Sequence, residues 1–356
     1  MNGIQKSIST RIEILRYVMI FGIVILHTPP YVPLSDIGDS FFDFIKAFFQ
    51  HAVFRTAVPV LTFVSGYLLF RTPALCQFAA VASKKTRTLL VPLILFNLPI
   101  ALVVLYLQFA YDGVSLSTVE LYPFNLLEFI DACVGLVEAP INYPLAFLRD
   151  LFVISLLAPV WHALYRHVPR LGAVLVFVVF WFNLDFKLVL RNEMAILFYF
   201  GGLASFQQWD MTRLDKHAAK LLLLFAILCA GVVAFRMENR VYLGLISPLM
   251  IWPAASLLLD TTLGKWIAGM AKYSFLTFLM QGPILTILWM GYNELPDSVP
   301  YWIFWLVAPV STAYIVALAY RFGVANFPGL MGIALGRSPR THGEVVQRSK
   351  SGTAKY

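Results

Sequence analysis

The sequence predicts an all-α protein that crosses a membrane about ten times. Hydrophobic residues make up 60% of the 356-residue chain, and charged residues make up only 13%. An ordinary globular domain is closer to half apolar and a quarter charged. Because a helix needs roughly 20 residues to cross a bilayer, the chain has room for about ten crossings and for no separate soluble domain.

Apolar runs between charged or Pro-rich breaks give the expected helices. The predicted spans cover residues 12–30, 44–70, 88–109, 143–165, 171–185, 192–209, 218–235, 241–259, 266–290 and 301–324. No small-residue cleavage site follows the first run, so we interpret it as a retained helix and not as a signal peptide. Residues 129–137 are too short and acidic to cross, and we expect an interfacial or re-entrant segment there.

Basic residues predict the orientation, because cytoplasmic loops accumulate Lys and Arg. Most of them fall in the N-terminal segment, in residues 71–87, in the connections after the fourth, sixth and eighth spans, and near the C-terminus. The opposite loops carry only Lys187, Arg191, Arg236 and Arg240. We therefore expect both termini to be cytoplasmic in a multi-pass membrane protein. The net charge of +8 is spread over loops that face anionic lipid, a pattern that does not indicate nucleic-acid binding.

The domain organisation is expected to be simple. Residues 1–330 would form one transmembrane bundle, and residues 331–356 a basic, disordered cytoplasmic tail. Cys76, Cys133 and Cys229 lie far apart without metal or redox spacing. We interpret them as packing residues and expect neither a disulfide framework nor a metal site.

Two ionisable residues in the first span form the leading candidate site. Arg16 and His27 are eleven residues apart, which places them about 20° apart around a helix and roughly 16 Å apart along it. Ionisable groups inside a membrane usually mark a functional path. The structural alternative is an arginine that reaches the headgroups and a histidine bonded to a backbone carbonyl.

Small and basic residues follow in the second span and the next loop. Ser65 and Gly66 supply a small surface that allows close helix approach. Lys84, Lys85 and Arg87 precede a helix start, where cations and free backbone amides suit phosphate groups. Positive-inside topology also explains this basic cluster.

Three further charges lie within predicted spans. Arg149 and Asp150 are adjacent in the fourth span and point roughly 100° apart, so each is expected to meet a group on another helix. They would form either a structural ion pair or part of a site. Arg55 in the second span has no partner that the sequence reveals.

Together these residues resemble the acyltransferase-3 family of integral membrane acyltransferases, which O-acetylate bacterial surface polysaccharides and related glycans. The resemblance runs through Arg16 with ten residues before His27, the segment 63–67, the basic loop 84–87 and the segment 145–151. It implies a multi-pass protein of the bacterial inner membrane and acyl transfer from cytoplasmic acyl-CoA to a sugar hydroxyl. It also implies that His27 is essential and that Arg16 supports it.

The sequence departs from the family pattern in three places. Ala146 stands where Trp is expected, Gln281 where many members have a second His, and Asn326 where many members have Glu two residues before Pro. The first change is expected to alter acceptor contact. The second leaves His27 as the single general base, and the third removes an acid.

An alcohol that attacks a thioester needs a base with a pKa near neutral, which histidine supplies. We predict that His27 is this base or a transient acyl carrier, with Arg16 beside it. Expected contacts to acetyl-CoA, the predicted acyl donor, come from Arg71, Lys84, Lys85, Arg87 and Ser65. Expected contacts to the glycan or lipid-linked saccharide acceptor come from Arg149, Asp150, Gln281 and Tyr67.

The competing interpretation is a transporter, such as a flippase of a lipid-linked sugar. Arg16, His27 and Arg149 would then line a substrate path and perform no chemistry. Acyl-CoA binding distinguishes the two classes. The sequence leaves open the acceptor, the identity of the acyl group and the oligomeric state.

Overall fold

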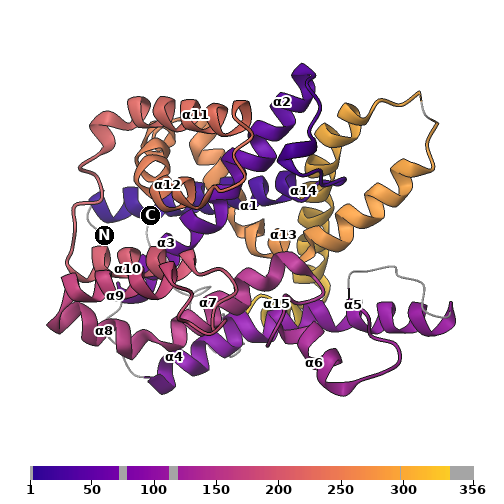
Figure 1. Cartoon of the computed structure of the whole chain (residues 1–356), viewed down its shortest axis with the longest axis horizontal. Helices are drawn as coiled ribbons and strands as arrows, with labels where there is room; N and C mark the ends of the chain where they lie inside the picture. Colours follow the sequence, from indigo (N-terminus) through magenta and orange to yellow (C-terminus); the bar gives the residue numbers. More distant parts are fainter. Residues whose placement is uncertain (1–2, 72–77, 112–118, 297, 337–356) are drawn as a thin grey trace, which may run out of the picture.

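The computed structural model describes residues 3–71, 78–111, 119–296 and 298–336, and every regular element in these ranges is helical (Figure 1). The predicted all-α fold is confirmed. The longer helices are α1 (Gly3–Leu26), α3 (Ala57–Phe70), α5 (Val91–Ala110), α7 (Ala146–Leu156), α8 (Ala158–His167), α9 (Pro169–Trp181), α10 (Glu193–Phe206), α11 (Ala218–Ala234), α12 (Val241–Ala254), α13 (Thr262–Asn293) and α14 (Tyr301–Asn326). Shorter ones are α2 (Phe41–Ala47), α4 (Phe78–Lys85), α6 (Leu126–Val134) and α15 (Pro328–Ala334).

Each predicted span contains a helix, but fewer helices have the length and apolar character of a membrane crossing. In the described part of the chain there are 6 such helices, or 7 if residues 143–156 and 158–167, which are bent by 53°, form one broken span. Helices α9 and α10 have 13 and 14 residues, fewer than the roughly 20 that cross a bilayer. The structure therefore supports a multi-pass helical membrane protein without confirming ten crossings.

Two predicted spans contain or adjoin π-helical segments in the described part of the chain. The second passes from α2 through the π-helical segment Phe48–Val53 and the 3₁₀ turn Phe54–Thr56 into α3. A second π-helical segment, Thr86–Leu90, joins α4 to α5. Such segments within a helix often mark functional positions. The π-helical segment Phe48–Val53 contains His51, and the 3₁₀ turn that follows it contains Arg55. The segment Thr86–Leu90 contains Arg87.

Helices α1 and α3 lie in the interior of the molecule (Figure 1). Helix α10 packs directly on α3, because a Cβ atom at Gly66 would overlap the carbonyl oxygen of Phe198 and one at Gly201 would overlap that of Phe63. The predicted close approach at Gly66 is confirmed. Helix α13 packs on α1, where the rings of Tyr17 and Trp266 meet edge to face with centroids 6.4 Å apart.

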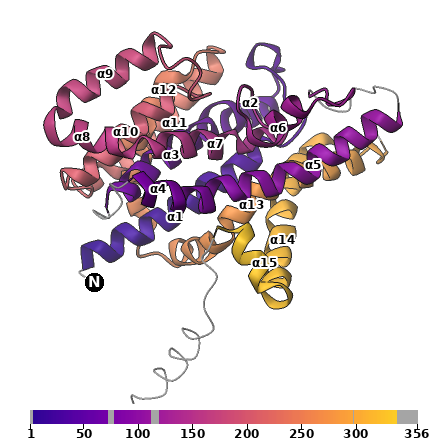
Figure 2. The ribbon, with the colours of Figure 1, turned by 90° about the horizontal axis from the view of Figure 1, so that it is seen from below.

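The basic loops gather at one end of the molecule. Figures 1 and 2 place the start of α1 and helix α4 towards the same end, and the connection between α13 and α14 at the opposite end. This grouping agrees with the loop assignment from the basic residues. The side of the membrane that each end faces stays a prediction.

The C-terminal part of the bundle extends past the predicted boundary at residue 330. Helix α15 runs to Ala334, and Leu335 is buried in a cluster with Leu276, Ile284 and Val316. The rest of the predicted tail, residues 337–356, lies outside the described residues.

Candidate active site

His27 directly follows the last residue of α1 and continues its hydrogen-bond pattern. Its backbone N–H donates to the carbonyl oxygen of Ile23 over 3.1 Å, and its ring Nδ1 lies 2.9 Å from the same oxygen. A carbonyl oxygen can only accept, so Nδ1 carries the ring proton in this contact and Nε2 keeps its lone pair. Since the side chain is partly exposed, Nε2 is the atom that can take a proton from a substrate.

The arginine buried in α1 is Arg11 and not Arg16. The side chain of Arg16 is exposed, with Glu13 close enough for its charge to act on Arg16, and the predicted role of Arg16 beside His27 stays a prediction. Arg11 is 1% exposed, donates to Asp215 over 2.9 Å and lies over the ring of Trp252 at 5.5 Å. The Arg11 contacts fix α1 against the segment before α11 and against α12.

The predicted donor contacts lie near the end of the molecule where α1 begins. Arg71, Lys84 and Arg87 are exposed, and Lys85 is partly buried. Arg71 directly follows α3. Lys84 and Lys85 end α4, and Arg87 belongs to the adjoining π-helical segment. Exposed cations on three neighbouring stretches of chain can hold several phosphate groups at once.

The Ser65–Tyr67 segment is occupied by packing. The Ser65 hydroxyl donates to the carbonyl oxygen of Leu61 over 2.7 Å. The Tyr67 side chain is buried, with its ring centroid 5.8 Å from that of Trp252. Their predicted contacts to substrate stay predictions, and each would require the side chain to change partners.

Arg149 and Asp150 bind each other and two loops. Arg149 donates to Asp150 over 3.1 Å, to the carbonyl of Gly135 over 2.7 Å and to that of Leu188. Asp150, which is fully buried, accepts from the backbone N–H groups of Leu190 and Arg191, the latter over 3.2 Å. The expectation that they meet groups on separate helices was wrong. The structure shows that the pair holds the loop carrying Arg191; its predicted contact with substrate stays a prediction.

Gln281 is a fully buried amide in α13. Neither its oxygen nor its nitrogen has a hydrogen-bond partner among the described residues. Leu285, one turn further along α13, shares a hydrophobic cluster with Val24, which lies three residues before His27. An unpaired buried amide costs about 1–3 kcal/mol, so a substrate group that bonded to Gln281 would recover this cost.

Three arginines that the sequence did not assign to the site form a cluster, in which the charges of Arg191 and Arg240 both act on Arg55. The charges of Arg55 and Arg191 both act on His27. Arg55 donates to the hydroxyl of Tyr31 over 2.8 Å, and Arg240 lies 3.1 Å from the Nδ1 atom of His51. The signal that could have found them was topological, since Arg191 and Arg240 are exceptions to the basic-loop pattern.

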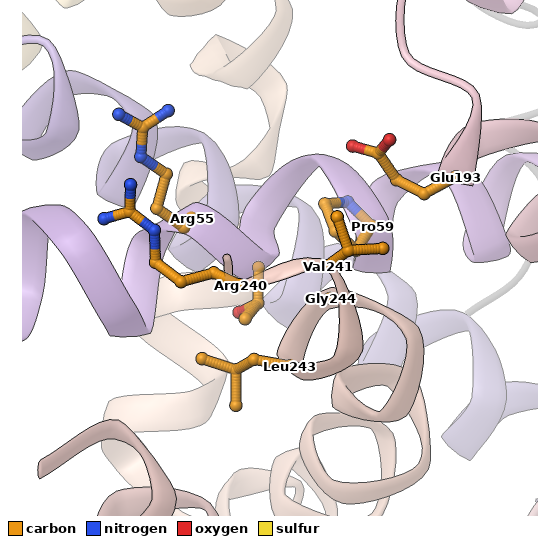
Figure 3. Close-up of a pocket in the computed structure, with 8 residues that line it drawn as sticks. Arg55, Pro59, Glu193, Arg240, Val241, Leu243 and Gly244 are labelled. Atoms are coloured by element: carbon orange, nitrogen blue, oxygen red, sulfur yellow. The ribbon is translucent and has the colours of Figure 1, made fainter. Parts of the chain in front are cut away.

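Two of these arginines, Arg55 and Arg240, line a cavity of about 180 Å³. It is lined by Arg55, Thr56, Pro59, Glu193, Arg240, Val241, Leu243 and Gly244 (Figure 3). Within the described ranges, no group of three or more His, Cys, Asp or Glu side chains is placed to hold a metal ion. The groups that the structure brings together near the end of α1 are the imidazole of His27 and the guanidinium groups of Arg55 and Arg191, whose charges act on it.

Comparison with known proteins identifies the family. A family model described as "Acyltransferase domain" matches residues 9–322. The chain belongs to this acyltransferase family. The predicted enzyme class is confirmed over the transporter alternative. The chain is also 27% identical over 370 aligned positions to the "Succinoglycan biosynthesis protein ExoH" of Rhizobium meliloti (strain 1021), with 99% of this chain and 98% of that protein covered. No solved structure matches the chain.

Proposed function

We propose that this acyltransferase is an integral membrane O-acyltransferase that modifies a glycan. It moves an acyl group from cytoplasmic acyl-CoA to a hydroxyl of a surface polysaccharide or lipid-linked saccharide. The acyl group that the sequence predicts is acetyl. The relative named for succinoglycan biosynthesis supports a polysaccharide acceptor. The structural observation behind the proposal is the placement of His27 at the end of α1, with Nδ1 turned to the carbonyl oxygen of Ile23 and with the charges of Arg55 and Arg191 acting on the ring.

The donor would enter at the opposite end of α1. Acyl-CoA supplies an acyl group activated as a thioester. The exposed side chains of Arg71, Lys84 and Arg87 fit its phosphate groups, since charged donors make the strongest phosphate contacts. Arg16 is exposed on α1 between this cluster and His27 and would contact the donor on its way along the helix.

His27 would act through Nε2. As the acceptor oxygen bonds to the acyl carbon, Nε2 takes the hydroxyl proton and then returns it to the leaving sulfur. The carbonyl of Ile23 keeps the proton on Nδ1 and fixes the ring orientation. The same atom would carry the acyl group in a two-step reaction. Gln281 would donate an N–H to the oxygen that becomes negative.

Transfer of a labelled acyl group tests the function directly. In a first experiment, the purified protein in liposomes is incubated with labelled acyl-CoA and a polysaccharide fraction. In a second experiment, mass spectrometry measures the masses of surface glycans from a strain that lacks the gene for this protein. We expect a labelled glycan in the first experiment and a lost acyl mass in the second. Absence of both results would contradict the proposal.

The donor contacts have their own test. Replacing Lys84, Lys85 and Arg87 by Ala should weaken acyl-CoA binding at least about tenfold, because each charge-assisted phosphate contact contributes roughly 1.5–3 kcal/mol. Added salt should weaken binding by the unaltered protein in the same direction. The matched control is the pair Lys216→Ala and Lys220→Ala, two exposed lysines on a predicted cytoplasmic connection. Unchanged affinity in the triple variant would leave the loop with a topological role alone.

A further inference from the structure

We propose that Arg55, Arg191 and Arg240 form an anion-binding subsite beside His27 for a carboxylate or phosphate carried by the acceptor. The inference rests on the proposed function and adds a substrate class to it, namely an acidic glycan or a phosphate-linked saccharide. The subsite would hold the charged group and thereby place a neighbouring hydroxyl near Nε2 of His27.

In the described part of the chain, no carboxylate forms a salt bridge with Arg55 or Arg191. The salt bridges in the described part of the chain involve Arg11, Arg149, Arg236 and Arg240, each with another partner. The Nε atom of Arg55 is buried and has no hydrogen-bond partner there, and its outer nitrogen donates to neutral Tyr31. A guanidinium keeps its charge in proteins, so Arg55 needs an anion in order to offset its partial burial.

Only part of the charge in the cluster is compensated. Glu238 lies 3.2 Å from Arg240 and also accepts from the backbone of Ser35. Figure 3 shows the guanidinium groups of Arg55 and Arg240 next to each other, with Glu193 set apart from them. Since Arg55 also experiences the charge of Arg191, the cluster has an excess of positive charge that repels itself. A bound anion would relieve this repulsion.

The arginines are held in place by the surrounding structure. Asp150 accepts from the backbone N–H of Arg191, and the guanidinium of Arg191 lies 5.5 Å from the ring centre of Tyr143. Arg55 lies at the same distance from the ring of Tyr31. Planar guanidinium groups fixed on aromatic rings present their donors in a set direction, which suits bidentate binding of a carboxylate or phosphate.

The size of the cavity limits what it can hold. Its volume of about 180 Å³ is below the roughly 300–1,000 Å³ of sites that enclose a whole small ligand. The cavity therefore suits one charged substituent and leaves the rest of the saccharide outside. Topology supports the same assignment, since positive-inside placement gives no reason for Arg191 and Arg240 on the predicted outer side.

The test measures binding of simple probes to the purified full-length protein in detergent. Saturation-transfer NMR compares glucuronic acid, glucose 1-phosphate and glucose, because this method detects weak ligands. We expect saturation of at least one anionic probe to exceed that of glucose. Arg55→Gln should weaken binding of that probe about tenfold or more, because it removes a charge-assisted contact. The control Arg213→Gln, at an exposed arginine on the predicted cytoplasmic side, should bind like the unaltered protein.

Each outcome has a defined meaning. A preference for glucuronic acid assigns the subsite to an acidic sugar, and a preference for glucose 1-phosphate assigns it to a phosphate link. Equal saturation by glucose, or unchanged binding in Arg55→Gln, overturns the subsite. If Arg55→Gln does not fold, Arg191→Gln replaces it with the same expectation. Acyl-CoA binding is measured on the same samples, so intact anion binding without any acyl-CoA binding would contradict the proposed function and leave the subsite standing.

Discussion

The ring of His27 can be altered while most of its local hydrogen bonding is kept. His27→Asn retains a side-chain donor for the carbonyl of Ile23 but removes the basic Nε2 atom. We expect a similar folded amount and an acyl-transfer rate lower by about two to four orders of magnitude, as for loss of a general base. The rate is measured with labelled acyl-CoA and normalised to folded protein by size-exclusion chromatography. His217→Asn, at an exposed position before α11, is the control. Wild-type turnover in His27→Asn would refute the catalytic assignment.

Replacing Gln281 can show whether its buried amide contributes to acyl transfer at the expense of folding stability. Gln281→Leu removes a buried amide that has no partner and fills a similar volume. We expect an unchanged or higher melting temperature, because the desolvation cost of about 1–3 kcal/mol disappears. We also expect slower acyl transfer, by about tenfold or more, if the amide donates to the developing oxyanion. A stabilised variant with full activity would mean that Gln281 does not contact the substrate.

The sequence singled out His27 as the candidate base, which stays a prediction, and it could not distinguish buried from exposed arginines on the same helix. Arg11 and Arg16 are five residues apart, so they lie about 140° apart around α1. Which of them is buried depends on Asp215, about 200 positions away in the chain, and on the ring of Trp252. Arg55 was unassigned for the same reason. Its neighbours Arg191 and Arg240 come from distant segments that only folding brings together.

At the scale of helices, the contact between α3 and α10 depends on glycine. A side chain at position 66 would meet the carbonyl oxygen of Phe198, which belongs to a helix backbone and cannot move far. We expect Gly66→Val to destabilise the protein by about 1–3 kcal/mol or more, as overpacking does. Gly231→Val is the control, because nothing lies within 4 Å of a Cβ atom there. Melting temperatures in detergent compare the two. Equal stability would show that α3 and α10 are not in such close contact.

Apolar runs located the helices because the hydrophobic signal is strong wherever a segment avoids water. They did not reveal where a helix changes geometry. The π-helical segment Phe48–Val53 lies inside the predicted second span, and the bend between α7 and α8 falls inside the predicted fourth span. The predicted number of crossings also exceeds the number of long apolar helices because α9 and α10 have only 13 and 14 residues and because α1 is not among the helices apolar enough to cross.

On the scale of the whole molecule, the two ends of α1 have different basic surfaces. Towards its start, Lys84 and Arg87 are exposed to solvent, which suits a large, highly charged donor. Towards its end, Arg55 and Arg240 line a small cavity and are held by Tyr31 and His51. This asymmetry suits the proposed transfer between a donor at one end of α1 and an acceptor at the other.

The orientation of these ends gives the last prediction. With the native cysteines replaced, we expect Asp39→Cys to react with a membrane-impermeant maleimide in intact cells. Asp39 is highly exposed and pairs with Arg236 on the predicted outer side. Ser83→Cys, on α4 beside Lys84, should react only after permeabilisation, because the basic loops are expected to be cytoplasmic.

Permeabilised cells provide the control that both cysteines are reactive. Labelling of Ser83→Cys in intact cells would reverse the topology. It would also place the basic cluster around Lys84 on the side of the membrane away from the proposed cytoplasmic acyl-CoA. The proposed donor route requires α4 to face the cytoplasm, so this single measurement tests the orientation of the chain and the direction of acyl transfer together.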